Sequence, residues 1–257
     1  MTKVIVITSG KGGVGKTTTA INLGAAMTHF GKDVIVIDGN LTTPNVGLHL
    51  GSPEAPVNLN HVLTKQADLY EAIYEHESGL KIIPASLSIK DLKDLKLENL
   101  KNLKKDLEDL SDFVIIDSSA GLGTEALSAI DLADELVVIT NPEMPAITDA
   151  LKAMKVAEQK KKLVKGVIMT RVRNNKSEMQ PEEVKDMLET DILGMVPEDI
   201  SIQEALKMKN PVVITHPKSK AARAYKEIAA QLVGEEYDSS VDTESIWEKI
   251  GNMFKVK

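Results

Sequence analysis

The chain has 257 residues, of which 42% are hydrophobic, and this length suits one large domain or two small ones. It contains no cysteine, which excludes disulfides, cysteine-ligated zinc and cysteine-ligated iron–sulfur clusters. The net charge of −7 argues against a dedicated nucleic-acid-coating protein. With only 3 Phe and 1 Trp, the core is expected to be aliphatic.

Short runs rich in Val and Ile alternate with helical patterns along the chain. Such near-continuous apolar runs are typical of strands that are covered on both faces. The predicted strands lie at 4–8, 34–37, 80–84, 113–116, 136–140 and 164–170. The predicted helices lie at 17–30, 97–110, 124–132, 146–159 and 182–189, and shorter apolar pieces follow at 193–196 and 211–214. The alternation predicts an α/β fold, a doubly wound and mainly parallel sheet flanked by helices in three layers, over residues 1–233.

Two segments outside the strand pattern also carry expectations. The leucines of 97–110 recur at helical spacing, so we expect one amphipathic helix with its leucines on the sheet and its charges in water. The first apolar run, 4–7, is too short for a signal peptide, and no window approaches the roughly 18 apolar residues of a membrane span. We therefore expect a cytoplasmic chain, for which attachment to a membrane surface stays open.

A glycine-rich segment follows the first predicted strand and opens the first predicted helix. Its residues match the pattern G-x-x-x-x-G-K-[ST] and are Gly10, Lys11, Gly12, Gly13, Val14, Gly15, Lys16, Thr17 and Thr18. The glycines let backbone N–H groups turn onto phosphate oxygens, and the helix directs its N-terminal amides at the same anion. Lys16 supplies a positive charge to the β- and γ-phosphates, and the hydroxyl of Thr17 is placed to bind Mg²⁺. The segment therefore predicts nucleotide binding.

Lys11 adds a second lysine to this loop. The pattern K-G-G-x-G-K-[ST]-T resembles the deviant Walker A group of P-loop NTPases, which includes the MinD cell-division ATPases and the ParA partition ATPases. The resemblance implies an ATP-dependent homodimer in which Lys11 reaches across to the phosphates of the partner, as a cation supplied in trans. The alternative is that Lys11 neutralises the phosphates of its own subunit.

The apolar strand at 113–116 ends in Asp117, which has the form of a Walker B motif. A single aspartate at a strand end is commonly a helix cap, but its place after a P-loop predicts a role near Mg²⁺, through water. The sequence D-x-x-x-G continues to Gly121, which could sense the γ-phosphate.

The strand at 34–37 ends in Asp38, which matches the first carboxylate of the family's D-x-D pattern and adds a second acidic group to the magnesium site. Asn45 matches the loop asparagine of the family and is a second candidate for sensing the γ-phosphate. Asn40 stands where the family has the aspartate that orients the attacking water, and an amide cannot accept a proton. The catalytic set that the resemblance implies is Lys11, Lys16, Asp38 and Asn40, with hydrolysis that is slow or that recruits another group.

The base pocket departs from the family pattern. Members usually have Asn-Arg at the end of the strand at 164–170, whereas this chain has Thr170 and Arg171. The later residues Pro197, Glu198 and Asp199 resemble the adenine-facing loop, which contributes mostly backbone groups. The resemblance therefore implies ATP, while Arg171 is equally well a base contact or a surface arginine at a strand end.

Within the family, the MinD branch is the most similar. Its Asn-Pro-Glu sequence is present at residues 141–143, and its Walker B segment differs here by Ser119 in place of proline. The sequence Ile-Thr-Asp-Ala at 147–150 also resembles that branch, where this helix is proposed to contact a protein partner. The absence of cysteine excludes the family's iron–sulfur branches.

The chain ends in two segments of different character. Residues 234–245 are acidic, polar and almost free of aliphatic residues, which predicts a flexible linker. In 246–257 the apolar residues share one helical face, which predicts an amphipathic membrane-targeting helix with lysines elsewhere; these residues are Ile246, Trp247, Ile250, Met253 and Phe254. The alternative is a helix that docks on its own domain.

These features together favour a MinD-like ATPase that binds ATP and Mg²⁺, dimerises and attaches reversibly to an anionic membrane surface. It would position cell division or another polar assembly with a protein partner that the sequence does not identify. One alternative is a ParA-like partition ATPase that binds DNA non-specifically, which the acidic net charge makes less favourable. Another is a nucleotide-gated regulator with little hydrolysis, which Asn40 favours.

Overall fold

The computed structural model describes residues 1–52, 54–92 and 95–238. The strands are β1 Lys3–Thr8, β2 Val34–Gly39, β3 Tyr74–Glu75, β4 Lys81–Ile83, β5 Phe113–Ser118, β6 Glu135–Thr140, β7 Leu163–Val172 and β8 Ile192–Pro197. The α-helices are α1 Lys16–His29, α2 Val46–His49, α3 Leu59–Leu63, α4 Thr124–Leu132, α5 Met144–Gln159, α6 Pro181–Leu188, α7 Ile200–Lys207, α8 Val212–Thr215 and α9 Lys220–Val233. Three 3₁₀ helices are η1 Leu69–Ala72, η2 Ile89–Leu92 and η3 Leu97–Lys104.

The described strands form a single sheet in the order β3-β4-β2-β5-β1-β6-β7-β8. Every pairing is parallel except that of the short edge strand β3 with β4. The six predicted strands are all present, and the apolar piece at 193–196 is the edge strand β8. Because the strands are parallel, β1, β2, β5, β7 and β8 all end at the same edge of the sheet, and the loops that follow them meet there.

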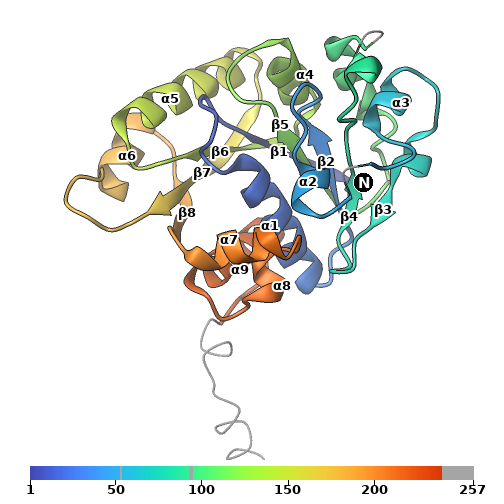
Figure 1. Ribbon diagram of the computed structural model, residues 1–257. Helices are drawn as coiled ribbons and strands as arrows, with labels where there is room; N and C mark the ends of the chain where they lie inside the picture. Colours follow the sequence, from blue (N-terminus) through green and yellow to red (C-terminus); the bar gives the residue numbers. More distant parts are fainter. Residues whose placement is uncertain (53, 93–94, 239–257) are drawn as a thin grey trace, which may run out of the picture.

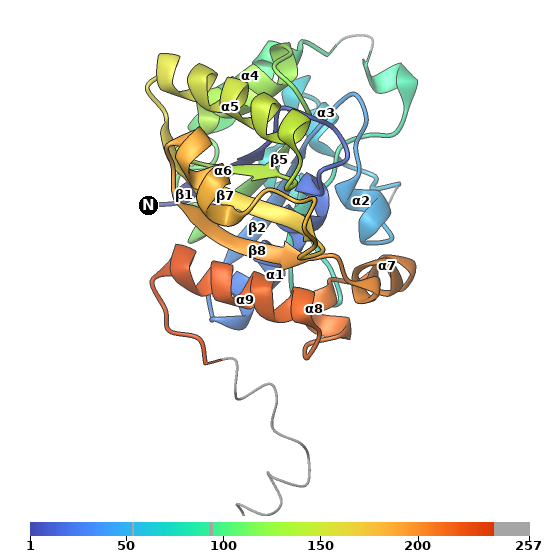
Figure 2. The same cartoon turned by 90° about the vertical axis from the view of Figure 1, so that its left-hand side faces the viewer.

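Helices cover both faces of the sheet, as Figures 1 and 2 show. Helices α1 and α9 lie side by side on one face, with α8 beside them. Helices α4 and α5 lie on the other face, and α6 packs against α5 near β7. The predicted doubly wound, three-layer α/β fold is therefore confirmed.

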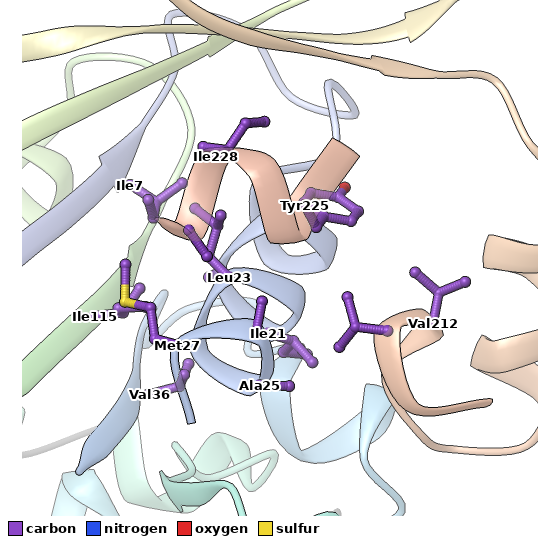
Figure 3. Packing of buried hydrophobic residues seen from close by; sticks show 14 of the residues in the cluster. Ile7, Ile21, Leu23, Ala25, Met27, Val36, Ile115, Val212, Tyr225 and Ile228 are labelled. Atoms are coloured by element: carbon purple, nitrogen blue, oxygen red, sulfur yellow. The ribbon is translucent and has the colours of Figure 1, made fainter. Parts of the chain in front are cut away.

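The core is aliphatic, as the composition predicts. Its largest cluster packs the α1 and α9 side chains against the sheet, and Figure 3 shows members from both helices, among them Leu23 of α1 and Ile228 of α9. Among the residues that the structure describes, Tyr225 is the largest fully buried side chain. Phe30 and Phe113 are only partly buried at the margin of this cluster. A few aromatic residues therefore suffice, because aliphatic side chains fill both helix–sheet interfaces.

The prediction of one long amphipathic α-helix at 97–110 is wrong. The segment forms the 3₁₀ helix η3 and then turns. The spacing accounts for this, because Leu97, Leu100 and Leu103 recur every three residues, which is the period of a 3₁₀ helix. The predicted burial of the leucine face is nevertheless correct, since Leu100, Leu103 and Leu107 are almost fully buried and η3 packs on α4.

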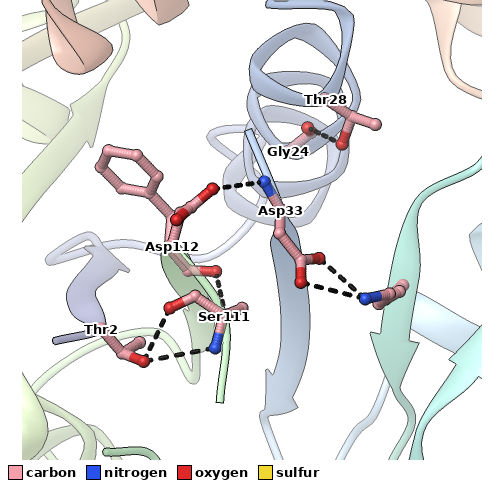
Figure 4. Close-up of polar contacts among 8 residues, drawn as sticks. Thr2, Gly24, Thr28, Asp33, Ser111 and Asp112 are labelled. Atoms are coloured by element: carbon pink, nitrogen blue, oxygen red, sulfur yellow. Dashed lines mark hydrogen bonds and ion pairs between the residues drawn. The ribbon is translucent and has the colours of Figure 1, made fainter. Parts of the chain in front are cut away.

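At the opposite edge of the sheet, where the strands begin, short polar contacts join neighbouring segments. The Asp112 carboxylate accepts the Asp33 N–H at 2.8 Å, and Asp33 in turn pairs with Lys81 (Figure 4). The Thr2 hydroxyl donates to the Ser111 carbonyl at 2.7 Å. These contacts fix the starts of β1, β2, β4 and β5 relative to one another.

Residues 234–238 lie against the end of α1. Glu235 forms an ion pair with Lys32 at 2.9 Å, and the Tyr237 ring meets Phe30 edge-on at 6.1 Å between centroids. The Lys226 ammonium lies 5.9 Å from the centre of the Tyr237 ring. The rest of the predicted linker and the predicted tail helix at 246–257 lie outside the described residues. Among the helices that the structure does describe, none is long and apolar enough to cross a bilayer.

Candidate nucleotide-binding site

A cavity of about 690 Å³ opens at the edge where the strands end. It lies between the loop from β1 to α1, the loop after β2 and the loop after β5. Nine predicted site residues line it, together with neighbours from the same loops; the nine are Gly12, Gly13, Gly15, Lys16, Thr17, Thr18, Asn40, Asn45 and Arg171. The fold thus brings most of the residues predicted from three separate motifs to one hollow.

The backbone of the phosphate-binding loop requires glycine at particular positions. Gly13 and Gly15 have φ of 77° and 94°, in the left-handed region where a side chain is strained. Gly10 is needed for a different reason, because a Cβ atom there would lie 2.0 Å from the backbone oxygen of Asp149 in α5. The loop is therefore held directly against α5.

The two lysines of the loop occupy different surroundings. Lys16 opens α1, is 9% exposed and lines the cavity. Its burial lowers the pKa of the ammonium group, and the nearby Asp117 carboxylate opposes that shift. Lys11 is exposed and is not among the residues that line the cavity. Of these two lysines, only Lys16 lies beside the cavity.

Asp117 and Asp38 are fully buried beneath the cavity and face each other in register on β5 and β2. The Thr17 hydroxyl donates to Oδ2 of Asp117 at 2.5 Å. Burial raises the pKa of Asp117 to about 6, against the opposing effects of Thr17 and Lys16. Burial, and then the charge of Asp117, raise the pKa of Asp38 to about 8, although it accepts the backbone N–H groups of Asn40, Asn45 and Val46. Both carboxyl groups are therefore costly to ionise unless a cation binds beside them.

These residues fit a bound Mg²⁺. Oδ1 of Asp117 is buried with no hydrogen-bond partner among the described atoms, so a polar ligand position is open beside Thr17. No group of three or more His, Asp or Glu side chains able to hold a metal occurs among the described residues. In nucleotide-binding proteins, Mg²⁺ is usually held by one or two protein groups together with waters and substrate phosphates. Thr17 and Asp117 would hold it.

The loop after β2 carries two asparagines at the cavity wall. The Asn40 amide donates to the Thr43 carbonyl at 2.7 Å, and its oxygen accepts the Thr43 hydroxyl at 3.0 Å. The Asn45 amide also donates to the Thr43 carbonyl, at 2.6 Å. Both side chains therefore hold the loop closed on itself as well as lining the cavity.

Gly121 and the predicted base loop, residues 197–199, do not line the main cavity. The Gly121 N–H donates to the Ser9 carbonyl at 3.0 Å, and Gly121 is not among the cavity-lining residues. A second, smaller cavity of about 220 Å³ adjoins the first, and it is lined by Arg171, Pro197, Glu198 and Asp199 among others. Gly15, Thr18 and Arg171 line both cavities, so the two hollows meet along the start of α1.

The side chains of the base loop are engaged in structural contacts. Glu198 pairs with Arg173, and Asp199 caps α7 by accepting the Ser201 N–H at 3.0 Å. Thr170, in β7, donates its hydroxyl to the Val14 carbonyl at 2.5 Å. Thr170 thus joins β7 to the phosphate-binding loop, and Pro197, Glu198 and Asp199 line the second cavity.

Sequence reasoning missed several residues that line the main cavity, chiefly Thr42, His49 and Glu125. Glu125 lies in the first turn of α4 and is 7% exposed. The sequence did contain a signal for Glu125, because it is an acidic residue in the first turn of the helix that follows the Walker B strand. Acidic residues at that position usually only stabilise the helix through its dipole.

Comparisons with known proteins agree with this geometry. A family model described as an AAA domain matches residues 2–170. An uncharacterized ATP-binding protein of Methanocaldococcus jannaschii is 41% identical over 241 residues, covering 94% of this chain and 91% of the relative. The septum site-determining protein MinD of Bacillus subtilis is 32% identical over 266 residues, covering 100% of this chain and 97% of the relative.

Solved structures show the same likeness. The septum site-determining protein MinD of Pyrococcus horikoshii, complexed with Mg-ADP, superposes with a TM-score of 0.87 at 33% identity, covering 90% of this chain and 96% of that one. MinD in the MinC:MinD cell division protein complex of Aquifex aeolicus gives a TM-score of 0.82 at 28% identity, covering 92% and 97%. The glycine-rich loop, the two buried aspartates and this likeness over almost the whole chain together show that the protein belongs to the MinD/ParA-type P-loop ATPase family, as a MinD-like ATP-binding protein.

Proposed function

We propose that this protein is an ATPase whose ATP-bound form dimerises, attaches to an anionic membrane surface through residues 246–257 and positions cell division or another polar assembly. ATP and Mg²⁺ bind at the main cavity, hydrolysis is slow, and loss of the nucleotide releases the protein from the membrane. The chain is then cytoplasmic, with reversible peripheral attachment.

The observation that carries the proposal is the position of Lys11. The lysine is exposed at the rim of the phosphate-binding loop and does not line the cavity, whereas Lys16 does. A cation so placed is available to the phosphates of a second subunit that closes face to face on the first. A cationic side chain that one subunit supplies to the active site of the other stabilises the negative charge of the phosphoryl-transfer transition state. The position disfavours the alternative in which Lys11 neutralises the phosphates of its own subunit.

Within one subunit the remaining residues have separate tasks. Mg²⁺, when bound, neutralises charge on the β- and γ-phosphates. The Lys16 ammonium and the amides of 12–16 hold those phosphates, Thr17 and Asp117 orient the ion, and Asp38 fixes the loop that carries Asn40 and Asn45. The second cavity accepts the adenine, against backbone groups of Pro197, Glu198 and Asp199 and beside Arg171.

Membrane attachment rests on the C-terminal sequence. Residues 246–257 place Ile246, Trp247, Ile250, Met253 and Phe254 on one helical face, with lysines elsewhere. Each lysine near an anionic surface contributes about 1 kcal/mol, so a single short helix binds weakly. A dimer presents two such segments, and joining them raises the overall affinity by about 100-fold or more. Stable attachment to the membrane therefore requires the dimer.

A protein partner is also expected. The structurally similar MinD of Aquifex aeolicus is recorded in a complex with MinC. In this chain Met144, at the start of α5, is 53% exposed and could contribute to such a contact. We propose that the partner is a protein rather than DNA, because the chain is acidic overall.

Liposome flotation tests the proposal. Full-length protein and a chain ending at residue 245 are mixed with phosphatidylglycerol-containing vesicles in ATP, in ADP or without nucleotide. The full chain should float with the vesicles in ATP only, and the shortened chain should stay at the bottom in all three. Nucleotide-independent flotation, or equal flotation of the two chains, would show the membrane role to be wrong. ATP-dependent, salt-sensitive binding to DNA of arbitrary sequence would favour a partition ATPase instead.

A further inference from the structure

Glu125 occupies a position that the nucleotide-binding motifs do not explain. It lies in the first turn of α4, in the wall of the 690 Å³ cavity, and is 7% exposed. Among the described residues that line this cavity, it is the only one with a carboxyl group. A carboxylate so nearly enclosed beside a phosphate site is costly unless it is hydrogen-bonded, so its partners are informative.

The loop after β2 supplies those partners. Oε1 of Glu125 accepts the backbone N–H of Thr42 at 2.9 Å, and Oε2 lies 3.4 Å from the Thr42 hydroxyl. Each carboxylate oxygen has about two acceptor positions, so each can still accept one further hydrogen bond. Thr42 is two residues from Asn40, so the carboxylate is fixed beside the segment in which the family resemblance implies a water-orienting aspartate.

Asn40 itself is not suited to that task. Its amide nitrogen donates to the Thr43 carbonyl, and its oxygen accepts both the hydroxyl and the N–H of Thr43. The side chain is therefore engaged within its own loop. An amide oxygen also has no useful basicity, so it can hold a water but cannot take a proton from it.

We propose that Glu125 is the catalytic residue that orients the attacking water in this chain, an inference that rests on the proposed ATP hydrolysis. The water oxygen forms a bond to the γ-phosphorus as the bond from that phosphorus to the β–γ bridging oxygen breaks. ADP leaves with the electron pair of the broken bond. One proton of the water is accepted by the Glu125 carboxylate and passed on to the product phosphate, so the carboxylate is regenerated. Groups that accept a proton in this way contribute roughly 100-fold or more to rate.

The substitution Glu125→Gln separates this role from a structural one. Glutamine keeps an oxygen to accept the Thr42 N–H, and its amide can donate to the Thr42 hydroxyl, so the loop contact is retained while the proton acceptor is removed. We expect kcat for ATP to fall about 100-fold, with the melting temperature and the Kd for Mg–AMP-PNP unchanged. After incubation with ATP, the variant should retain ATP rather than ADP when the bound nucleotide is identified by chromatography. The control Glu158→Gln, on the exposed face of α5, should match the unsubstituted chain in every measurement.

A second variant tests whether the missing chemistry is a carboxylate at this place. Asn40→Asp added to Glu125→Gln should recover at least tenfold of the lost kcat. Unchanged kcat in Glu125→Gln would overturn the assignment, and so would a fall in kcat accompanied by weaker AMP-PNP binding or a lower melting temperature. If the unsubstituted chain binds Mg–ATP but never turns it over, the proposed hydrolysis fails, and the role of Glu125 fails with it.

Discussion

At the scale of single residues, Gly10 shows how little space the phosphate-binding loop has. A Cβ atom at this position would meet the backbone oxygen of Asp149 at 2.0 Å, and backbone cannot move aside as a flexible side chain would. We expect Gly10→Ala to cost about 1–3 kcal/mol of stability and to weaken Mg–ATP binding by more than tenfold. Thermal melting and nucleotide titration measure the two effects. Gly123→Ala is the matched control for melting, because nothing lies within 4 Å of its Cβ position; equal losses in both variants would contradict the explanation.

We expect the effect of Mg²⁺ on ATP affinity to depend on Thr17. Its hydroxyl bonds to Oδ2 of Asp117, whose other oxygen is buried with no partner among the described atoms. Thr17→Val keeps the shape and removes the oxygen, so we expect the gain in ATP affinity on adding Mg²⁺ to shrink by about tenfold, or about 1.4 kcal/mol. Fluorescent-nucleotide titrations with Mg²⁺ and with EDTA measure that gain.

Thr28→Val is the control for that experiment. Thr28 lies in the same helix, but its hydroxyl donates to the Gly24 carbonyl at 3.0 Å, away from the nucleotide site (Figure 4). Its magnesium response should equal that of the unsubstituted chain. An identical response in Thr17→Val would show that the ion is held without the hydroxyl.

At the scale of elements, η3 packs against α4, the helix that carries Glu125, and should hold it in place. Leu100 is fully buried in the cluster that joins η3 to α4 and the sheet. Leu100→Ala should therefore cost about 2–5 kcal/mol in urea unfolding. Leu87→Ala, at a side chain that is 44% exposed, should change stability by less than about 0.5 kcal/mol. Similar values for the two variants would mean that η3 contributes little to holding α4.

At the scale of the whole molecule, dimerisation should depend on one exposed lysine. Lys11→Ala removes a charge that does not line the cavity of its own subunit. We therefore expect Mg–AMP-PNP to bind the monomer with an affinity within about threefold of normal, and the nucleotide-dependent dimer to be lost. Size-exclusion chromatography with light scattering measures the mass, and Lys176→Ala, at an exposed lysine far along the chain, should still dimerise. Loss of nucleotide binding itself in Lys11→Ala would place the lysine on its own phosphates.

The sequence predicted the fold well because each buried strand is a short Val/Ile run, and such runs are hard to place anywhere but inside a sheet covered on both faces. It predicted the phosphate-binding loop because the motif is local. Gly13 and Gly15 are required by the left-handed backbone of the loop, and Lys16 directly follows them. It mistook η3 for an α-helix, since a leucine repeat of three residues suits either helix when only burial is considered. It missed Glu125, because the contact that places this side chain beside the cavity is with Thr42, 83 residues earlier in the chain. Residues 246–257 stay a prediction from sequence.

The position of residues 234–238 has a consequence for geometry. Helix α1 begins at the phosphate loop and ends where Glu235 and Tyr237 meet Lys32 and Phe30, so it connects opposite poles of the subunit. With about 1.5 Å per residue, its 14 residues separate the two poles by about 20 Å. A subunit held at its C-terminal pole would thus keep its nucleotide pole clear of the lipid headgroups. On the proposed attachment, a partner protein could therefore reach the nucleotide pole from the cytoplasmic side while the protein stayed on the membrane.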